Sequence, residues 1–127
     1  IYNLLGRAFF AQKTFDRAIQ AFEMGLIVDP EDMRLKLNLA SAQAESGDLA
    51  EALASVEEVI HRNEDNAVAF LNRGILHYRD NNEDLACADL SHALHLDPSL
   101  EMAENALAKI ESFRTAKIQN TAAESRT

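Results

Sequence analysis

The sequence predicts an all-α fold built from paired helices. Apolar residues recur at spacings of three and four along most of the chain, which places them on one face of a helix. Residues 15–28 are an example, with Phe15, Ile19, Phe22, Leu26 and Ile27. Four Gly and two Pro among 127 residues are too few for an all-β protein with many tight turns. Abundant Ala and few aromatics suit closely packed helices.

Breaks between the periodic stretches divide the chain into helices. Gly47 suits the left-handed end of one helix, and Asp48 suits the N-cap of the next. Asn81 and Asn82 occupy the same places later, and the pairs Asp29-Pro30 and Asp97-Pro98 are expected to end one helix and begin another. The pattern predicts seven helices, over residues 1–12, 15–28, 31–46, 49–62, 65–80, 83–96 and 98–117.

An internal repeat of 34 residues runs through these helices. Two copies of a Gly, Ala and Pro trio lie 68 residues apart, at Gly6, Ala18, Pro30 and at Gly74, Ala86, Pro98. The positions halfway between them hold Ala40, Ala52 and Glu64. Small residues at the first two positions let the axes of a helix pair approach to about 8–10 Å. The repeat therefore predicts helix pairs of similar structure stacked side by side.

The repeat resembles the tetratricopeptide repeat family, whose pattern is W-x2-L-G-x2-Y, then A-x3-F, then P. The first copy reads Tyr2, Leu5, Gly6, Phe9, Ala18, Phe22, Pro30. The second reads Lys36, Leu39, Ala40, Gln43, Ala52, Val56, Glu64. The third reads Phe70, Arg73, Gly74, His77, Ala86, Leu90, Pro98. The resemblance implies an α-solenoid of antiparallel helix pairs wound into a right-handed superhelix.

Residues 1–117 are predicted to form the repeat array. The repeats span about residues 1–32, 33–66 and 67–100, and a capping helix follows over 98–117. Apolar residues of that helix should cover the third pair; they are Met102, Ala106, Leu107, Ile110 and Phe113. Residues 118–127 lose the apolar pattern and are expected to be a disordered or frayed tail.

Composition excludes several classes of protein. A net charge of −9 disfavours binding to nucleic acid, and no apolar run approaches the length of a membrane span. The single Cys87 is interpreted as a small apolar residue of a helix. No signal segment is visible, so the cytoplasm is the default compartment. The chain opens with Ile1 directly in a helical pattern, which we interpret as a native N-terminus that is missing.

The sequence does not predict an enzyme. His92 and His95 share a helix face with Asp89, so a metal site is conceivable, but His95 and His61 occupy one repeat position that is expected to face outward. Neighbouring carboxylates such as Glu57 and Glu58 point in different directions on a helix. No Ser, His and Asp triad and no glycine-rich phosphate loop is present. Neither a metal nor a cofactor is expected.

The concave side of the predicted solenoid is the candidate binding surface. The first helix of each pair should line it. Asn38 and Asn72 lie one repeat apart, and an amide can both donate to and accept from the backbone of an extended peptide. Similar Asn rows occur in peptide-binding members of the family. The predicted peptide-binding residues are Asn3, Arg7, Arg34, Asn38, Ser41, Asn72, Ile75, Tyr78 and Arg79.

Arginines make this surface less acidic than the rest, so an acidic or C-terminal carboxylate ligand is compatible with it. Family members that hold a terminal carboxylate use a clamp of Lys, Asn and Arg. Of the five clamp positions only Asn38 matches; the other four hold Asn3, Arg7, Val68 and Asn72. The resemblance therefore argues against that specific clamp.

Two functions follow from the sequence. The first is a scaffold that binds a peptide or a segment of a partner protein in the concave groove, as one part of a larger protein or assembly. The alternative is a structural module that forms homo-oligomers through its uncapped N-terminal end, where Ile1, Leu4 and Leu5 should be exposed. Neither function involves insertion into a membrane.

Overall fold

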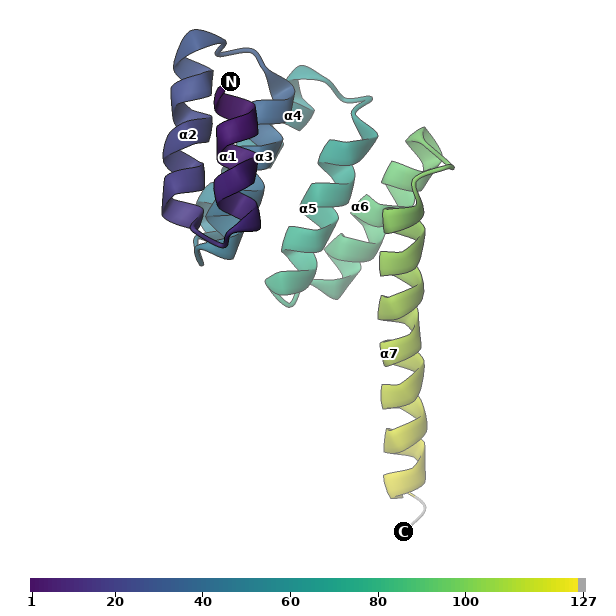
Figure 1. Ribbon diagram of the computed structural model, residues 1–127. Helices are drawn as coiled ribbons and strands as arrows, with labels where there is room; N and C mark the ends of the chain where they lie inside the picture. The colour runs from purple at the N-terminus through teal and green to yellow at the C-terminus, as the bar shows by residue number, and fades with distance from the viewer. Residues whose placement is uncertain (126–127) are drawn as a thin grey trace.

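The computed structural model describes residues 1–125, which form seven α-helices and no strand (Figure 1). Six helices make three antiparallel pairs, and a longer seventh helix follows. Their bounds are Tyr2–Ala11 for α1, Phe15–Val28 for α2, Met33–Glu45 for α3, Leu49–Arg62 for α4, Ala67–Arg79 for α5, Glu83–Leu96 for α6 and Glu101–Ser125 for α7. The all-α solenoid and the number of helices are as predicted.

Capping residues explain where several helices begin. The Asp48 carboxylate accepts a hydrogen bond from the backbone N–H of Glu51, as expected for the N-cap of α4. The expectation that Asp29-Pro30 also begins the next helix is wrong: Asp29 ends α2, and Asp32 caps α3 by accepting from the N–H groups of Arg34 and Leu35. The Asp-Pro pairs thus end helices, and the next helix starts a few residues later.

The turn between the two helices of each pair contains one residue whose backbone has the left-handed conformation. Lys13, Gly47 and Asn81 lie 34 residues apart and have φ values of 61°, 97° and 62°. Gly adopts this conformation freely and Asn tolerates it, whereas it is sterically unfavourable for Lys. The backbone geometry of the repeat is therefore kept even in the copy whose sequence opposes it.

Glycine allows the two helices of a pair to touch. A Cβ atom at Gly6 would lie 2.3 Å from the Phe22 ring, and one at Gly74 would lie 2.9 Å from Cγ of Leu90. Ala18, on α2, is fully buried at the same junction, as are its equivalents in the other two pairs. The small residues of the repeat thus act within each pair, as predicted. Phe22 also packs towards the next pair.

The pairs stack so that their first helices line one side. Contacts join α1 to α3, α3 to α5 and α5 to α7, whereas no contact joins α2 to α4 or α4 to α6 among residues 1–125. The second helices are therefore splayed apart on the outside, and the side lined by α1, α3 and α5 is concave. This arrangement positions the candidate groove.

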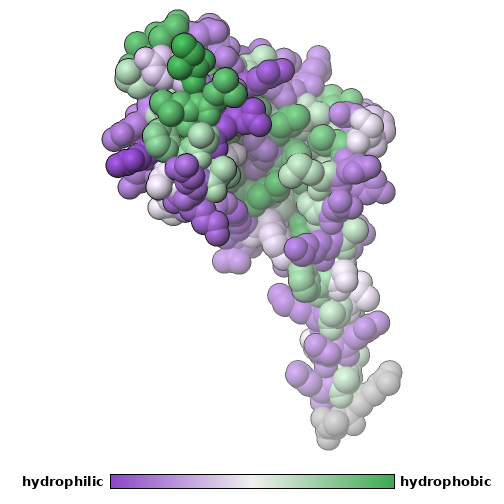
Figure 2. Space-filling view, in the orientation of Figure 1, coloured by the Kyte–Doolittle hydropathy of each residue, from purple (hydrophilic) through white to green (hydrophobic). Residues whose placement is uncertain are grey.

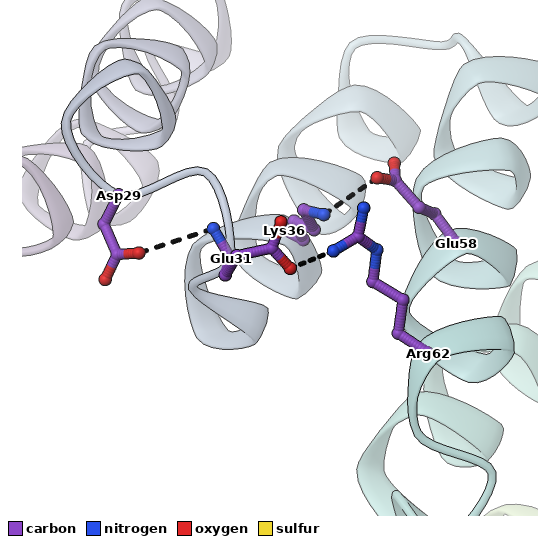
Figure 3. Close-up of polar contacts among 5 residues, drawn as sticks. All are labelled: Asp29, Glu31, Lys36, Glu58 and Arg62. Carbon is purple, nitrogen blue, oxygen red and sulfur yellow. Dashed lines mark hydrogen bonds and ion pairs between the residues drawn. The ribbon is translucent and has the colours of Figure 1, made fainter.

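Ion pairs tie α3 and the loop before it to α4 (Figure 3). Lys36 stands at the repeat position that holds Tyr2 and Phe70 in the other copies, and it is buried. Its Nζ atom donates to Oε1 of Glu58 at 2.8 Å, and this hydrogen bond lowers the pKa of Glu58. Arg62 pairs with Glu31 beside it. The second copy thus replaces an aromatic contact with a charged one.

The seventh helix covers the third pair and then projects beyond it (Figure 1). Ala103 and Ile110 are buried, but Met102 and Phe113, predicted to cover the pair, are exposed. The prediction that this helix ends at residue 117 is wrong, because it continues to Ser125; residues 126 and 127 of the predicted tail lie outside the described residues. No helix within residues 1–125 has both the length and the apolarity to cross a membrane.

Candidate functional site

The concave side contains two adjoining hollows. Figure 2, which views the molecule as in Figure 1, shows apolar surface within a depression that is bordered by hydrophilic side chains. One hollow lies between α1 and α3, and the other between α3 and α5. Phe10 and Ser41 line both of them, so the two hollows form one surface, which we call the groove.

The hollow between α1 and α3 is polar on one side and aromatic on the other. It has a volume of about 220 Å³ and is lined by Arg7, Phe10, Ala11, Phe22, Asn38 and Ser41. The Asn38 amide donates to Oδ1 of Asn3 at 2.7 Å, which joins α3 to α1 and orients both side chains. The remaining hydrogen-bonding capacity of these two amides is available to a ligand.

The hollow between α3 and α5 is smaller and more apolar. It has a volume of about 140 Å³. Its lining residues are Phe10, Ala40, Ser41, Ala44, Glu45, Val56, Asn72, Ile75, Leu76 and Arg79. The side-chain amide of Asn72 has no hydrogen-bond partner within residues 1–125, so it can serve an incoming peptide.

Charge is distributed unevenly along the groove. Arg79 donates from one Nη atom to Oε1 of Glu45 at 2.5 Å, so its charge is balanced within the groove wall. Arg7 is exposed and forms no ion pair with any acidic group in the described part of the chain. The positive charge available to a ligand is therefore concentrated at the α1 end of the groove.

Most of the predicted binding residues meet in the groove. Arg7, Asn38, Ser41, Asn72, Ile75 and Arg79 line its two hollows, and Asn3 touches it through Asn38. Arg34 lies in the first turn of α3, outside both hollows. Tyr78 lines a separate polar cleft between the α5–α6 turn and α7, beside Arg114.

Phe10 and Ala44 are groove residues that the sequence interpretation missed. They occupy one repeat position, which Tyr78 holds in the third copy. Extending the 34-residue spacing from Tyr78 would have found both. Glu45 and Arg79 also share one repeat position, yet their pairing across neighbouring helices could not be read from the spacing alone.

The histidines do not form a metal site in the described residues. No group of three or more His, Cys, Asp or Glu side chains within residues 1–125 could hold a metal ion. His92 contacts the edge of Phe70, with ring centroids 4.4 Å apart, and His95 stacks on His92. His61 and His95 are both exposed, as their shared repeat position predicts.

A tetratricopeptide repeat family model matches residues 9–73, which is just over half of the chain. The chain belongs to the tetratricopeptide repeat family. The 34-residue period, the small residues at the helix junctions and the concave row of first helices are therefore family features of this chain. Comparison with curated protein sequences gave no match.

Solved structures of similar fold include domains of a protein named RPAP3. The first such domain of human RPAP3 has a TM-score of 0.82 and 26% identity, and the match covers 93% of each chain. A first repeat domain described as Spaghetti (RPAP3), bound to the HSP90 peptide SRMEEVD, has a TM-score of 0.78 and 26% identity, with 90% of each chain covered. The second human domain, in complex with the HSP70 peptide SGPTIEEVD, has a TM-score of 0.75 and 25% identity, covering 87% of this chain and 92% of that one.

Proposed function

We propose that the chain is a protein-interaction scaffold that binds an extended segment of a partner protein along the groove. The observation that carries this proposal is the continuity of the two hollows, which share Phe10 and Ser41. Arg7, Asn38 and Asn72 consequently face one continuous surface. The similar RPAP3 domains are described in complex with chaperone peptides, which supports peptide binding as the function of this chain.

Amide chemistry suits the recognition of a peptide backbone. Asn38 and Asn72 stand at the same repeat position on α3 and α5, so their amides recur along the groove. An extended peptide exposes N–H and C=O groups that need partners once water is displaced, and an amide satisfies either kind. Such contacts bind the backbone with little dependence on side-chain sequence.

The proposed ligand does not bind through the clamp of Lys, Asn and Arg by which some family members hold a terminal carboxylate. Four of the five clamp positions differ here, and Val68 at one of them offers neither charge nor a hydrogen bond. An acidic group on the ligand would instead meet Arg7, because Arg79 already pairs with Glu45. The side-chain carboxylate of Asp or Glu and a C-terminal carboxylate are both suitable ligands for this single site at Arg7.

Replacing both Asn38 and Asn72 by Ala should weaken peptide binding about tenfold. Two lost hydrogen-bonding groups remove roughly 0.5–1.5 kcal/mol each. The free energy of unfolding should change by about 1 kcal/mol at most, because both side chains are only half-buried and the one hydrogen bond lost is that from Asn38 to Asn3. The measurement is binding to an array of unrelated peptides, followed by titration of those retained. The matched control is Asn105→Ala with Asn120→Ala, two exposed amides of α7. Equal affinities of the double variant and the native chain would remove the groove proposal.

Self-association is a second candidate function. It is favoured by an apolar face of α1 and α2 on which no other helix packs in residues 1–125. Ile1 and Leu5 are 98% and 44% exposed, whereas their repeat equivalents in α3, Leu35 and Leu39, are buried among residues that include Phe22 of α2. A shallow depression continues this face; it is lined by Tyr2, Leu5, Phe9, Arg17, Gln20, Ala21 and Met24. Apolar side chains at these positions are suited to a helical partner.

A second copy could meet this face with the same face of its own. The opposite end of the array is packed against α7, so the equivalent face of the third pair is not open to head-to-tail stacking. Two copies would join through the same face, which gives a twofold dimer. Sedimentation equilibrium at high concentration should then show a dimer, and Leu5→Glu should return it to a monomer. A native chain that stays monomeric throughout would contradict self-association.

A further inference from the structure

The charge of the groove and the volume of its hollows specify more of the ligand than its backbone. Resting on the groove as the peptide site, we infer that it selects a segment with one apolar anchor side chain for the hollow between α3 and α5. The same segment carries a carboxylate towards Arg7 and none towards Arg79. The ligand is thus an acidic–apolar segment bound in one direction.

The apolar anchor follows from the size and lining of the hollow between α3 and α5. Its volume of about 140 Å³ is close to that of an apolar protein cavity of ~150 Å³ that binds benzene. Ala40 and Ala44 leave the space open, and Phe10 and Ile75 stand at its sides. A side chain of the size of Leu, Ile, Met or Phe matches that space.

The repeat itself shows why the hollow is open. Ala44 occupies the position that holds an aromatic ring in the other two copies, Phe10 and Tyr78. A ring at residue 44 would fill the space between α3 and α5 from within the chain. Because residue 44 is Ala and not an aromatic residue, the hollow has space for a side chain of the ligand.

The direction of the charge follows from the two groove arginines. Arg7 offers an exposed guanidinium without an acidic partner in the described residues, at the end of the groove formed by α1. Arg79 is engaged by Glu45 at 2.5 Å, and both groups of that pair remain partly exposed. A carboxylate arriving there would have to displace Glu45 and would be repelled by it. The Glu45–Arg79 pair thus closes one end of the groove to acidic groups.

The spacing between anchor and carboxylate is also constrained. Alternate side chains of an extended segment point the same way and lie about 7 Å apart. The two hollows adjoin through Phe10 and Ser41. With an anchor in the α3–α5 hollow, the residue two positions away is therefore expected to lie towards the adjoining α1–α3 hollow, which Arg7 lines. We expect the acidic residue at that spacing, on one side of the anchor only.

A positional-scanning library of acetylated, amidated hexapeptides tests this inference on the full chain. The expected result is enrichment of Leu, Ile, Met or Phe at one position and of Asp or Glu two positions away on one side. Arg7→Gln should abolish the acidic preference and keep the apolar one. Glu45→Gln should admit acidic residues on both sides of the anchor. A second library with free C-termini separates a terminal carboxylate from a side-chain carboxylate.

A variant that fills the hollow between α3 and α5 complements the peptide libraries. Ala44→Phe should lower the affinity of the best peptide at least tenfold, whereas Ala54→Phe, on the exposed face of α4, should not. Should Ala44→Phe fail to fold, Ile75→Ala widens the hollow and should shift the preference towards Phe. Unchanged selectivity in a folded variant would overturn the inference.

The possible failures are distinguishable. Peptides that bind without apolar or acidic preference, yet are lost when Asn38 and Asn72 are both replaced by Ala, would overturn the ligand class and leave the groove as the binding site. Peptides that bind equally to that double variant would overturn the groove proposal, and the inference with it.

Discussion

Replacing Gly74 with Leu should lower the free energy of unfolding by about 3 kcal/mol, near the upper end of the usual cost of overpacking. Even a single Cβ atom at this position would lie 2.9 Å from Cγ of Leu90 and 3.2 Å from the backbone oxygen of Ala86. Leu90 is fully buried, so it cannot move aside into solvent. The α5–α6 pair must separate to admit the new side chain.

Urea unfolding of the native chain and the Gly74→Leu variant measures this loss. The matched control is Ala88→Leu, which adds the same side chain to an exposed position of α6 and should change stability by less than about 0.5 kcal/mol. Combining Gly74→Leu with Leu90→Ala should recover part of the stability, because the smaller residue makes room. A Gly74→Leu variant as stable as the control would contradict the role of Gly74 in the close approach of these helices.

The main features of the fold could be predicted because the repeat supplies each signal three times. Gly47 and Asn81 identify the turn residue of their pairs, and Lys13 could be placed at the same point only by the spacing. Helix ends were less predictable where local signals conflict. The Asp-Pro pairs resemble helix starts, yet the chain makes a turn at Pro30 before Asp32 provides the N-cap.

The groove could be predicted in part. The structure places Asn38 and Asn72, which lie 34 residues apart, in the hollows of the concave side, and their role in binding stays a prediction. Properties that depend on two neighbouring helices were not available from periodicity. The Glu45–Arg79 pair and the open space above Ala44 arise from which side chain happens to stand opposite another, so they require the packed structure.

Asp89→Ala should cost about 3 kcal/mol of stability, because it breaks an ion pair whose carboxylate is buried and whose guanidinium is only partly exposed. Asp89 is 7% exposed and accepts two hydrogen bonds from Arg73, at 2.8 Å from Nε and 2.9 Å from an Nη atom. These bonds raise the pKa of Arg73. When Asp89 is lost the guanidinium still stays charged, because the ordinary pKa of an arginine lies far above neutral pH. His77, whose Nε2 atom lies 3.6 Å from Asp89 and whose Nδ1 atom has no hydrogen bond, offers no replacement acceptor for both donors.

The double variant Arg73→Leu with Asp89→Ala distinguishes two contributions to the free energy of unfolding. One is the cost of leaving the Arg73 charge without a partner, and the other is the stabilisation by the ion pair itself. It reproduces the residues of the first repeat, Leu5 and Ala21, at the same two positions. Replacement of a buried ion pair by apolar residues is often neutral or stabilising, whereas removal of one partner is not. Urea unfolding should therefore find the double variant more stable than Asp89→Ala, with a coupling energy on the order of 2 kcal/mol. Additive losses would mean that Arg73 and Asp89 act independently, and that the contact of Arg73 with the Phe70 ring supports the guanidinium instead.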